Sequence, residues 1–194
     1  MLDKKNTFLL FYKDNSQDNV SIEKYEKWLE TSDREHISNF IVARLQRRYI
    51  RPFNCLFYKN GFAMMGCASL LIETLQCFRE GRPDSENIDG VKLFTNFFTD
   101  SKTKLNDFKS IHFYKHIRCG ILHQGETTGG FKIRRDGELY NSGEKIINAT
   151  KFLKELNQDV INYGEQLKSE KMCHPLWVNF MKKMYAIIDN CAIQ

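Results

Sequence analysis

Proline is scarce in this chain of 194 residues, which has only three, at Pro52, Pro83 and Pro175. Because proline interrupts helices, its scarcity favours long helical segments. The six cysteines include no CxxC pair, and Cys67 and Cys77 fall inside strongly apolar sequence. This pattern argues against a disulfide framework and predicts small buried thiols in a reducing compartment.

Several signature sequences are also missing. The chain has no GxxxxGK[ST] loop, no GxGxxG after a predicted strand and no GxSxG. Their absence argues against P-loop nucleotide hydrolysis, dinucleotide binding and serine-hydrolase chemistry. The apolar run at residues 8–12 is too short for a signal peptide, and the apolar residues 61–79 are too short and too polar at their end for a membrane span. We therefore expect a cytoplasmic protein that makes no membrane contact.

The composition is that of an ordinary globular protein, with 42% hydrophobic and 27% charged residues. We expect one domain over residues 1–194, with a possible extended N-terminal arm at residues 1–20. The net charge of +5 is compatible with a polyanionic partner but does not require one. Solvent-facing charge is the simpler explanation of the two basic clusters, which are Arg44, Arg47, Arg48 and Arg51, and then Lys132, Arg134 and Arg135.

The spacing of apolar residues predicts helices along most of the chain. Ser21 is a candidate N-cap for the first, and Ser32 with Glu35 forms a candidate capping box for the second, which Arg51–Pro52 would end. The remaining predicted helices cover residues 61–79, 91–98, 105–123, 146–167 and a last segment from Pro175.

One β element is predicted. Residues 131–135 and 138–140 flank Asp136–Gly137, a strong signal for a two-residue hairpin turn. The sequence thus predicts an all-α, up-and-down bundle of five or six helices with a small β-hairpin inserted at residues 131–141.

Chemistry concentrates at the end of the predicted helix 105–123. Three of the five histidines lie in residues 112–126, together with Arg118. Histidine exchanges protons near neutral pH, and a guanidinium can bind a phosphate through two parallel hydrogen bonds. Glu73, alone among apolar neighbours in residues 61–79, is a candidate to orient Arg118. The alternative places Glu73 on an exposed polar stripe with Ser69 and Gln76.

Helical geometry restricts this site. On a regular helix, five residues at about 100° each put Arg118 and His123 roughly 140° apart. The two side chains converge in one chain only if the helix loosens at Gly120 or if Arg118 reaches around. Pairing between two copies would relax this demand.

The Arg118-x4-His123 motif, at the end of a helix in a helical chain of this length, resembles the R-x(4–6)-H signature of the HEPN superfamily. The resemblance covers most of the helical chain in architecture but rests on about a dozen residues in sequence. Cys119 stands where active members often have Asn, Asp or His. The resemblance implies a HEPN-like bundle that forms a homodimer and acts as a metal-independent endoribonuclease without a cofactor, in a prokaryotic defence or toxin–antitoxin setting.

In this interpretation the catalytic residues are Arg118, which stabilises charge on the phosphate, His123, which is general base or acid, and Glu73. Candidate RNA-binding residues follow the motif, and they are Gln124, Glu126, Lys132, Arg134 and Arg135. The implied partners are RNA, a second copy of the chain, and an antitoxin or effector protein. The rival function is a non-catalytic HEPN-like module that binds a partner protein or a nucleotide.

A histidine stripe offers a different interpretation. His112, His116, Cys119 and His123 would share one side of a continuous helix, but they would spread over about 16 Å, so no single metal ion could bind all four. Two alternatives remain: a histidine pair binds a metal with ligands from elsewhere, or these side chains line a buried helix or a subunit seam.

Overall fold

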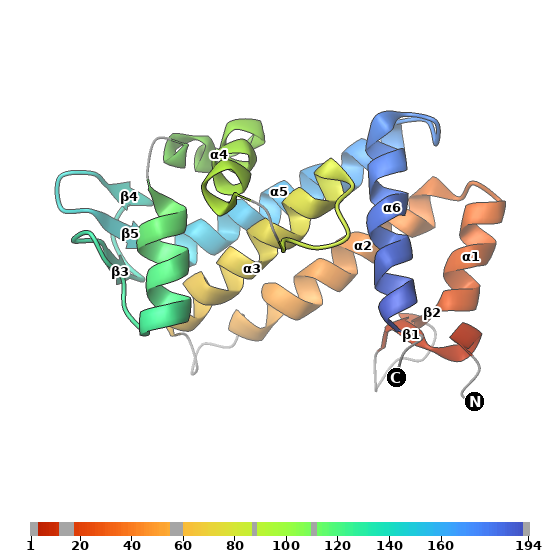
Figure 1. Cartoon of the computed structure of the whole chain (residues 1–194), viewed down its shortest axis with the longest axis horizontal. Helices are drawn as coiled ribbons and strands as arrows, with labels where there is room; N and C mark the ends of the chain where they lie inside the picture. The colour runs from red at the N-terminus through yellow and green to blue at the C-terminus, as the bar shows by residue number, and fades with distance from the viewer. Residues whose placement is uncertain (1–3, 12–17, 55–59, 87–88, 110–111, 192–194) are drawn as a thin grey trace. The chain divides into compact units, whose positions relative to one another are not determined.

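The computed structural model describes residues 4–11, 18–54, 60–86, 89–109 and 112–191. Within these ranges there are six α-helices, one π-helix and two small sheets, so the prediction of a mainly helical protein is confirmed (Figure 1). The chain divides into two compact units, whose boundaries along the chain follow residues 45, 76, 84 and 162. The first unit comprises residues 1–45, 77–84 and 163–194, and the second comprises residues 46–76 and 85–162. The single domain over residues 1–194 stays a prediction.

The first unit pairs two short strands with helical segments. Strand β1 (Phe8–Leu10) runs antiparallel to β2 (Val20–Ser21), and α1 (Ile22–Glu30) follows at once. The remainder comes from most of α2 (Arg34–Tyr49), the end of α3 (Gly61–Glu80), the end of α5 (Ala149–Ser169) and all of α6 (Pro175–Asn190). A short 3₁₀ turn, η1 (Lys4–Asn6), precedes β1, while Tyr12 of the predicted apolar run lies outside the described residues.

The core of the first unit is aromatic. Trp177, Tyr163 and Phe180 are almost fully buried, and the indole N–H of Trp177 donates to the carbonyl of Leu167. Arg44 is also buried, and its guanidinium donates to the carbonyl oxygen of Leu9. The simple explanation of the first basic cluster as solvent-facing is therefore wrong for this residue, because its charged end serves a backbone acceptor.

Local cap signals were reliable with one exception. The Ser21 hydroxyl accepts a hydrogen bond from the backbone N–H of Lys24, and α6 begins at Pro175, as predicted. The predicted capping box at Ser32 is wrong. Ser32 has a positive φ of 54° and ends the turn after α1, whereas the Asp33 carboxylate accepts from the N–H of His36 at the start of α2.

The second unit surrounds a cluster of phenylalanines. Helix α4 (Gly90–Asp100) and a 3₁₀ turn, η5 (Lys104–Phe108), supply part of it, and α5 (Ala149–Ser169) supplies Phe152. Phe113 stacks on Phe152 at a centroid distance of 5.3 Å and meets Phe98 edge-on at 5.1 Å. Such aromatic pairs add to the stability that burial alone provides. The unit also includes η3 (Arg51–Phe53), the first part of α3 (Gly61–Glu80), and the π-helix η6 (Tyr114–Gln124).

The predicted hairpin at residues 131–141 is wrong in its pairing. Strands β3 (Lys132–Arg134) and β4 (Tyr140–Asn141) do turn at Gly137, which has a φ of 78°, but they do not pair with each other. Both pair with β5 (Ile146–Asn148), β3 in parallel and β4 antiparallel. Ile146 was assigned to the long helix by its apolar spacing. It lies instead in the middle strand, where all three residues are buried.

The predicted helix 105–123 is also wrong as one continuous element. It contains η5 and the separate π-helix η6, which reaches Gln124. Gly129 and Gly130 do not end η6, because Gly125, with a φ of 71°, already occupies its left-handed C-cap.

One helix in the described part of the chain, α3, is long and apolar enough to span a membrane. Within its most apolar stretch, 67% of the residues are buried in the protein. That burial is typical of a core helix.

Candidate functional site

The R-x4-H motif lies on η6, which is wound more loosely than an α-helix. A π-helix bonds residue i to i+5, so each turn holds about one residue more than the 3.6 of an α-helix. Residues five apart therefore return nearly to the same side. Eleven residues are unusual for a π-helix, which mostly occurs as a single turn at functional sites.

The end of η6 folds back against its own middle. The backbone N–H of Glu126 donates to the carbonyl of Gly120 at 3.3 Å, and a Cβ on Gly120 would lie 2.5 Å from the Glu126 carbonyl oxygen. Only glycine allows this approach without a shift of the backbone. The loosening that the motif required is thus present, and Gly120 lies at its centre.

Arg118 and His123 meet within one chain. Arg118 Nη1 lies 3.1 Å from His123 Nε2. A guanidinium can only donate, so this hydrogen bond requires the tautomer in which Nε2 is the acceptor and the proton is on Nδ1. The histidine is exposed, while 20% of the Arg118 side chain is accessible. The two motif residues therefore form a hydrogen-bonded pair within one chain, with His123 on the exposed side of the pair.

Glu73 of α3 fixes Arg118 from the other side. Its Oε1 accepts from Arg118 Nε at 2.7 Å, and its Oε2 accepts from the Ser85 hydroxyl at 3.1 Å. Burial opposes the charge on Arg118, but the hydrogen bond and the charge of Glu73 outweigh it and raise the pKa of the guanidinium. The alternative of an exposed stripe is wrong, because Ser69, Glu73 and Gln76 are all buried.

Tyr114 belongs to the same cluster, and the sequence reasoning missed it. Arg118 Cζ lies 5.5 Å from the centre of the Tyr114 ring, within cation–π range. Burial is the largest of the effects that raise the pKa of Tyr114, followed by its interaction with Cys119. The ring occupies the space that a side chain at position 90 would need, so Gly90 makes room for it. The spacing of four residues between Tyr114 and Arg118 was the available signal.

The histidine stripe divides into separate interactions. His116 Nδ1 lies 2.8 Å from the Thr128 hydroxyl and its ring stacks on Phe131 at 5.7 Å, whereas His123 faces Arg118. His112 and His116 have ring centres 6.2 Å apart. In the described part of the chain, no three His, Cys, Asp or Glu residues are grouped so that they could hold a metal ion.

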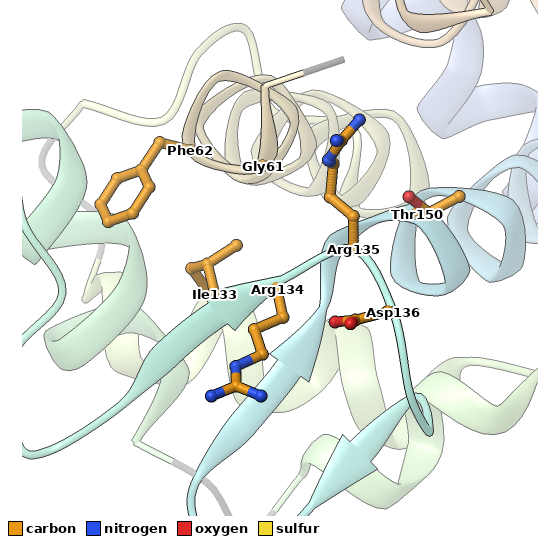
Figure 2. A pocket seen from close by; sticks show the side chains of 7 residues that line it. All are labelled: Gly61, Phe62, Ile133, Arg134, Arg135, Asp136 and Thr150. Atoms are coloured by element: carbon orange, nitrogen blue, oxygen red, sulfur yellow. The ribbon is translucent and has the colours of Figure 1, made fainter. Parts of the chain in front are cut away.

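The predicted RNA-binding residues form two groups. Gln124 and Glu126 are exposed at the end of η6, close to the Arg118–His123 pair in sequence. Arg134 and Arg135 instead line a cavity of about 590 Å³ where α3 and α5 begin, together with Phe62 (Figure 2). Lys132 is exposed on the same strand, β3, but it does not line this cavity.

The two places are separated along α3. Gly61 borders the cavity and Glu73 bonds Arg118, and the rise over the twelve positions from Gly61 to Glu73 is roughly 18 Å of helix at 1.5 Å per residue. Helix η6 runs beside this segment, since a Cβ on Gly66 would contact Ile121 and Leu122 at 3.7 and 4.0 Å.

Comparison of the chain with protein-family models, with curated proteins and with solved structures gives no match. The functional argument therefore depends on the site itself. An imidazole beside a fixed guanidinium places a group of the kind that exchanges protons and a positive charge within about one hydrogen-bond length of each other. This combination suits a reaction in which a hydroxyl loses a proton and a phosphate gains negative charge.

Proposed function

We propose that the protein is a metal-independent endoribonuclease of the HEPN type. The observation that carries the proposal is the contact of Arg118 with both Glu73 and His123 on a loosened helix. Support also comes from the exposure of His123, which leaves the imidazole accessible to a substrate that displaces Arg118 from Nε2. A prokaryotic defence or toxin–antitoxin role, with an antitoxin or effector as partner, follows from the family resemblance and belongs to the same proposal.

The reaction is a transesterification within the RNA, in which the bond from phosphorus to the 5′-oxygen is replaced by a bond to the neighbouring 2′-oxygen. The 2′-hydroxyl displaces Arg118 Nη1 from His123 Nε2, which then takes the hydroxyl proton, while the hydroxyl oxygen attacks the adjacent phosphorus and the bond to the 5′-oxygen breaks. Arg118 stabilises the charge that gathers on the five-coordinate phosphate. The leaving 5′-oxygen receives a proton, and the products carry a 2′,3′-cyclic phosphate and a 5′-hydroxyl.

Glu73 and Tyr114 are positioning residues in this scheme. Glu73 occupies the Nε–H of Arg118 and so directs the two terminal nitrogens of the guanidinium toward His123 and the substrate. Once His123 Nε2 is protonated, it has no lone pair left to accept from Arg118, so the hydrogen bond between them cannot re-form. The imidazolium is then available to protonate the leaving oxygen.

A homodimer would bring two such sites together. Leu70 of α3 and Leu122 of η6 are large apolar side chains that are 42% and 41% exposed. Leu70 lies one turn beyond Gly66, which neighbours Leu122, so both leucines border the site on the same side. We place the dimer contact on this small apolar surface, beside the two catalytic residues.

The direct test is RNA cleavage by the purified protein in the presence of EDTA. We expect cyclic-phosphate products from the wild type and loss of cleavage in both R118A and H123A. The matched controls are R48A and H112A, which remove an exposed arginine and an exposed histidine elsewhere and should cut at the wild-type rate. Cleavage by R118A and H123A at the wild-type rate would rule out the proposed site. No cleavage by any protein would favour a non-catalytic binding module.

The dimer is tested separately by light scattering. We expect L70E to shift the protein from dimer to monomer, because a carboxylate cannot be buried unpaired in an apolar contact. V91E is the control, since Val91 is 50% exposed on α4. A monomeric wild type would exclude this contact.

A further inference from the structure

We infer that the cavity beside β3 binds single-stranded RNA, and that it holds the strand a short distance from the bond to be cut. This inference rests on the proposed function for its choice of RNA. The cavity of about 590 Å³ falls within the range of roughly 300–1,000 Å³ that is usual for ligand pockets. It lies entirely within the second unit, and every residue that lines it is described.

The charges of the cavity favour an anion. Among the residues that the structure describes, Arg134 and Arg135 have no side-chain hydrogen bond or ion pair, and both are exposed. Asp136 removes one charge, so the lining carries a net charge of +1 from two arginines and one aspartate. Phosphate contacts of this sequence-independent kind supply much of the affinity for nucleic acids.

The directions of the two arginines favour a strand over a single phosphate. Figure 2 shows Arg134 and Arg135 leaving the backbone in opposite directions, as consecutive residues at a strand do. Strand β3 is at the edge of its sheet, because the order is β3–β5–β4. One phosphate cannot bind both guanidinium groups across that edge, whereas two phosphates of one flexible strand can.

The uncharged walls suit a base. Phe62, at the start of α3, is half-buried and lies in Figure 2 on the opposite side of Ile133 from Arg135. An aromatic ring gives an unpaired base a stacking surface whatever its identity. The Thr150 hydroxyl, in the first turn of α5, adds a donor and acceptor for a base edge or a sugar. A double helix keeps its bases paired and stacked, so only an unpaired nucleotide could use this surface.

The separation from the catalytic pair also suits a strand. Roughly 18 Å of α3 lies between Gly61 and Glu73, at 1.5 Å per residue. An extended strand of a few nucleotides can span that length. The cavity would then fix the register of the RNA on the protein, while Arg118 and His123 act on the phosphodiester at the other end.

The test measures binding without cleavage. A fluorescent 2′-O-methyl oligouridylate of about eight nucleotides, a length that single-strand modules can cover, lacks the attacking hydroxyl and so stays intact on the wild-type protein. We expect R134A/R135A to raise its Kd about 10-fold or more. The slope of log K against log salt should become shallower by about 1.4, since each of two lost phosphate contacts contributes about 0.7. F62A should raise the Kd about 5-fold or more through lost stacking.

The matched control is K92A/K154A, which removes two exposed charges from α4 and α5 of the same unit. An equal loss of affinity in this control would assign binding to the overall charge of the unit and would overturn the proposal that the cavity is the binding site. Equally effective competition by inorganic phosphate or uridine monophosphate and by the oligonucleotide would overturn the proposal that the cavity binds a strand. So would absence of oligonucleotide binding by the wild type.

The two proposals fail independently. Binding that depends on the cavity without any RNA cleavage would refute the proposed catalysis and leave the binding site. Cleavage that depends on Arg118, with normal oligonucleotide binding by R134A/R135A, would refute the binding site and leave the catalysis.

Discussion

The cluster of Glu73, Arg118 and His123 and the cavity beside β3 border the same segment of α3, yet they treat their arginines in opposite ways. The Arg118 side chain is 20% accessible and bonds two partners. Arg134 and Arg135 are exposed, and within the described ranges neither guanidinium has a partner. A guanidinium in a fixed place suits a charge that develops at one point, whereas exposed guanidinium groups without a protein partner suit a flexible polyanion.

The largest effect is expected from R118K, a variant that keeps the positive charge of Arg118 and changes its geometry. Lysine is a point charge and cannot reproduce the fork that joins Glu73 to His123. We expect R118K to lower kcat for RNA cleavage about 100-fold, the loss typical of one stabilising donor, with a small change in KM. The counterpart R135K should stay within about 2-fold in both constants, because a phosphate contact tolerates either cation. Similar losses in the two variants would contradict the distinction.

The next effect concerns stability. E73A leaves the partly buried Arg118 without its carboxylate and removes the acceptor of Ser85. We expect the free energy of unfolding to fall by about 2–3 kcal/mol, less than for a fully buried pair because Arg118 keeps some solvent contact. The control E126A changes an exposed carboxylate and should cost less than about 0.5 kcal/mol. Urea denaturation measures both, and an unchanged midpoint for E73A would mean that the ion pair does not hold η6.

A smaller loss should follow from closing the space at Gly120. In G120A the new Cβ meets the Glu126 carbonyl, so the turn after η6 must move, at a cost of about 1–3 kcal/mol. G66A is the matched control on α3, because its Cβ makes ordinary contacts with Ile121 and Leu122. There we expect no loss, or a gain of about 0.5–1 kcal/mol from reduced freedom of the unfolded chain. Thermal unfolding separates the two, and equal destabilisation would show that the wide helix does not depend on Gly120.

The smallest effect concerns His116 of η6, which contacts Thr128 and Phe131 in the segment between η6 and β3. Burial, followed by the positive charges of Lys115, His112 and Lys145, lowers the pKa of His116 below its ordinary value of 6.5. A lowered pKa stabilises the fold above the unfolded value and loses that contribution as the pH falls through the folded value. The unfolding midpoint of the wild type should therefore decrease as the pH falls below 6.5.

H116N should weaken that pH dependence, since it removes the titrating ring. T128V is the control, because it removes the hydrogen bond to His116 and leaves the ring able to titrate. A pH profile for H116N identical to that of the wild type would assign the effect to another group.

Local patterns predicted much of the helical structure. The Ser21 cap, the start of α6 at Pro175 and the apolar helix at residues 61–80 depend on neighbours within a turn or two, so the sequence alone contained the information. The Asp136–Gly137 signal correctly marked a chain reversal but could not say what each strand would pair with. Strand β5 lies between β3 and β4, and its buried residues Ile146 and Ile147 fit the apolar spacing of the helix that follows.

The sequence by itself determined which residues are candidates for chemistry, namely the arginine and histidine five apart and a lone glutamate in an apolar helix. Tertiary structure decided that they meet. On a regular helix the pair would diverge, and η6 instead widens where Gly120 receives the returning backbone of Glu126 and where Arg118 is held by Glu73, forty-five residues away in the chain. The physical reason is that residue periodicity predicts regular helices, whereas this rare π-helix forms where Gly120 meets the returning backbone and where Glu73 of another helix holds Arg118.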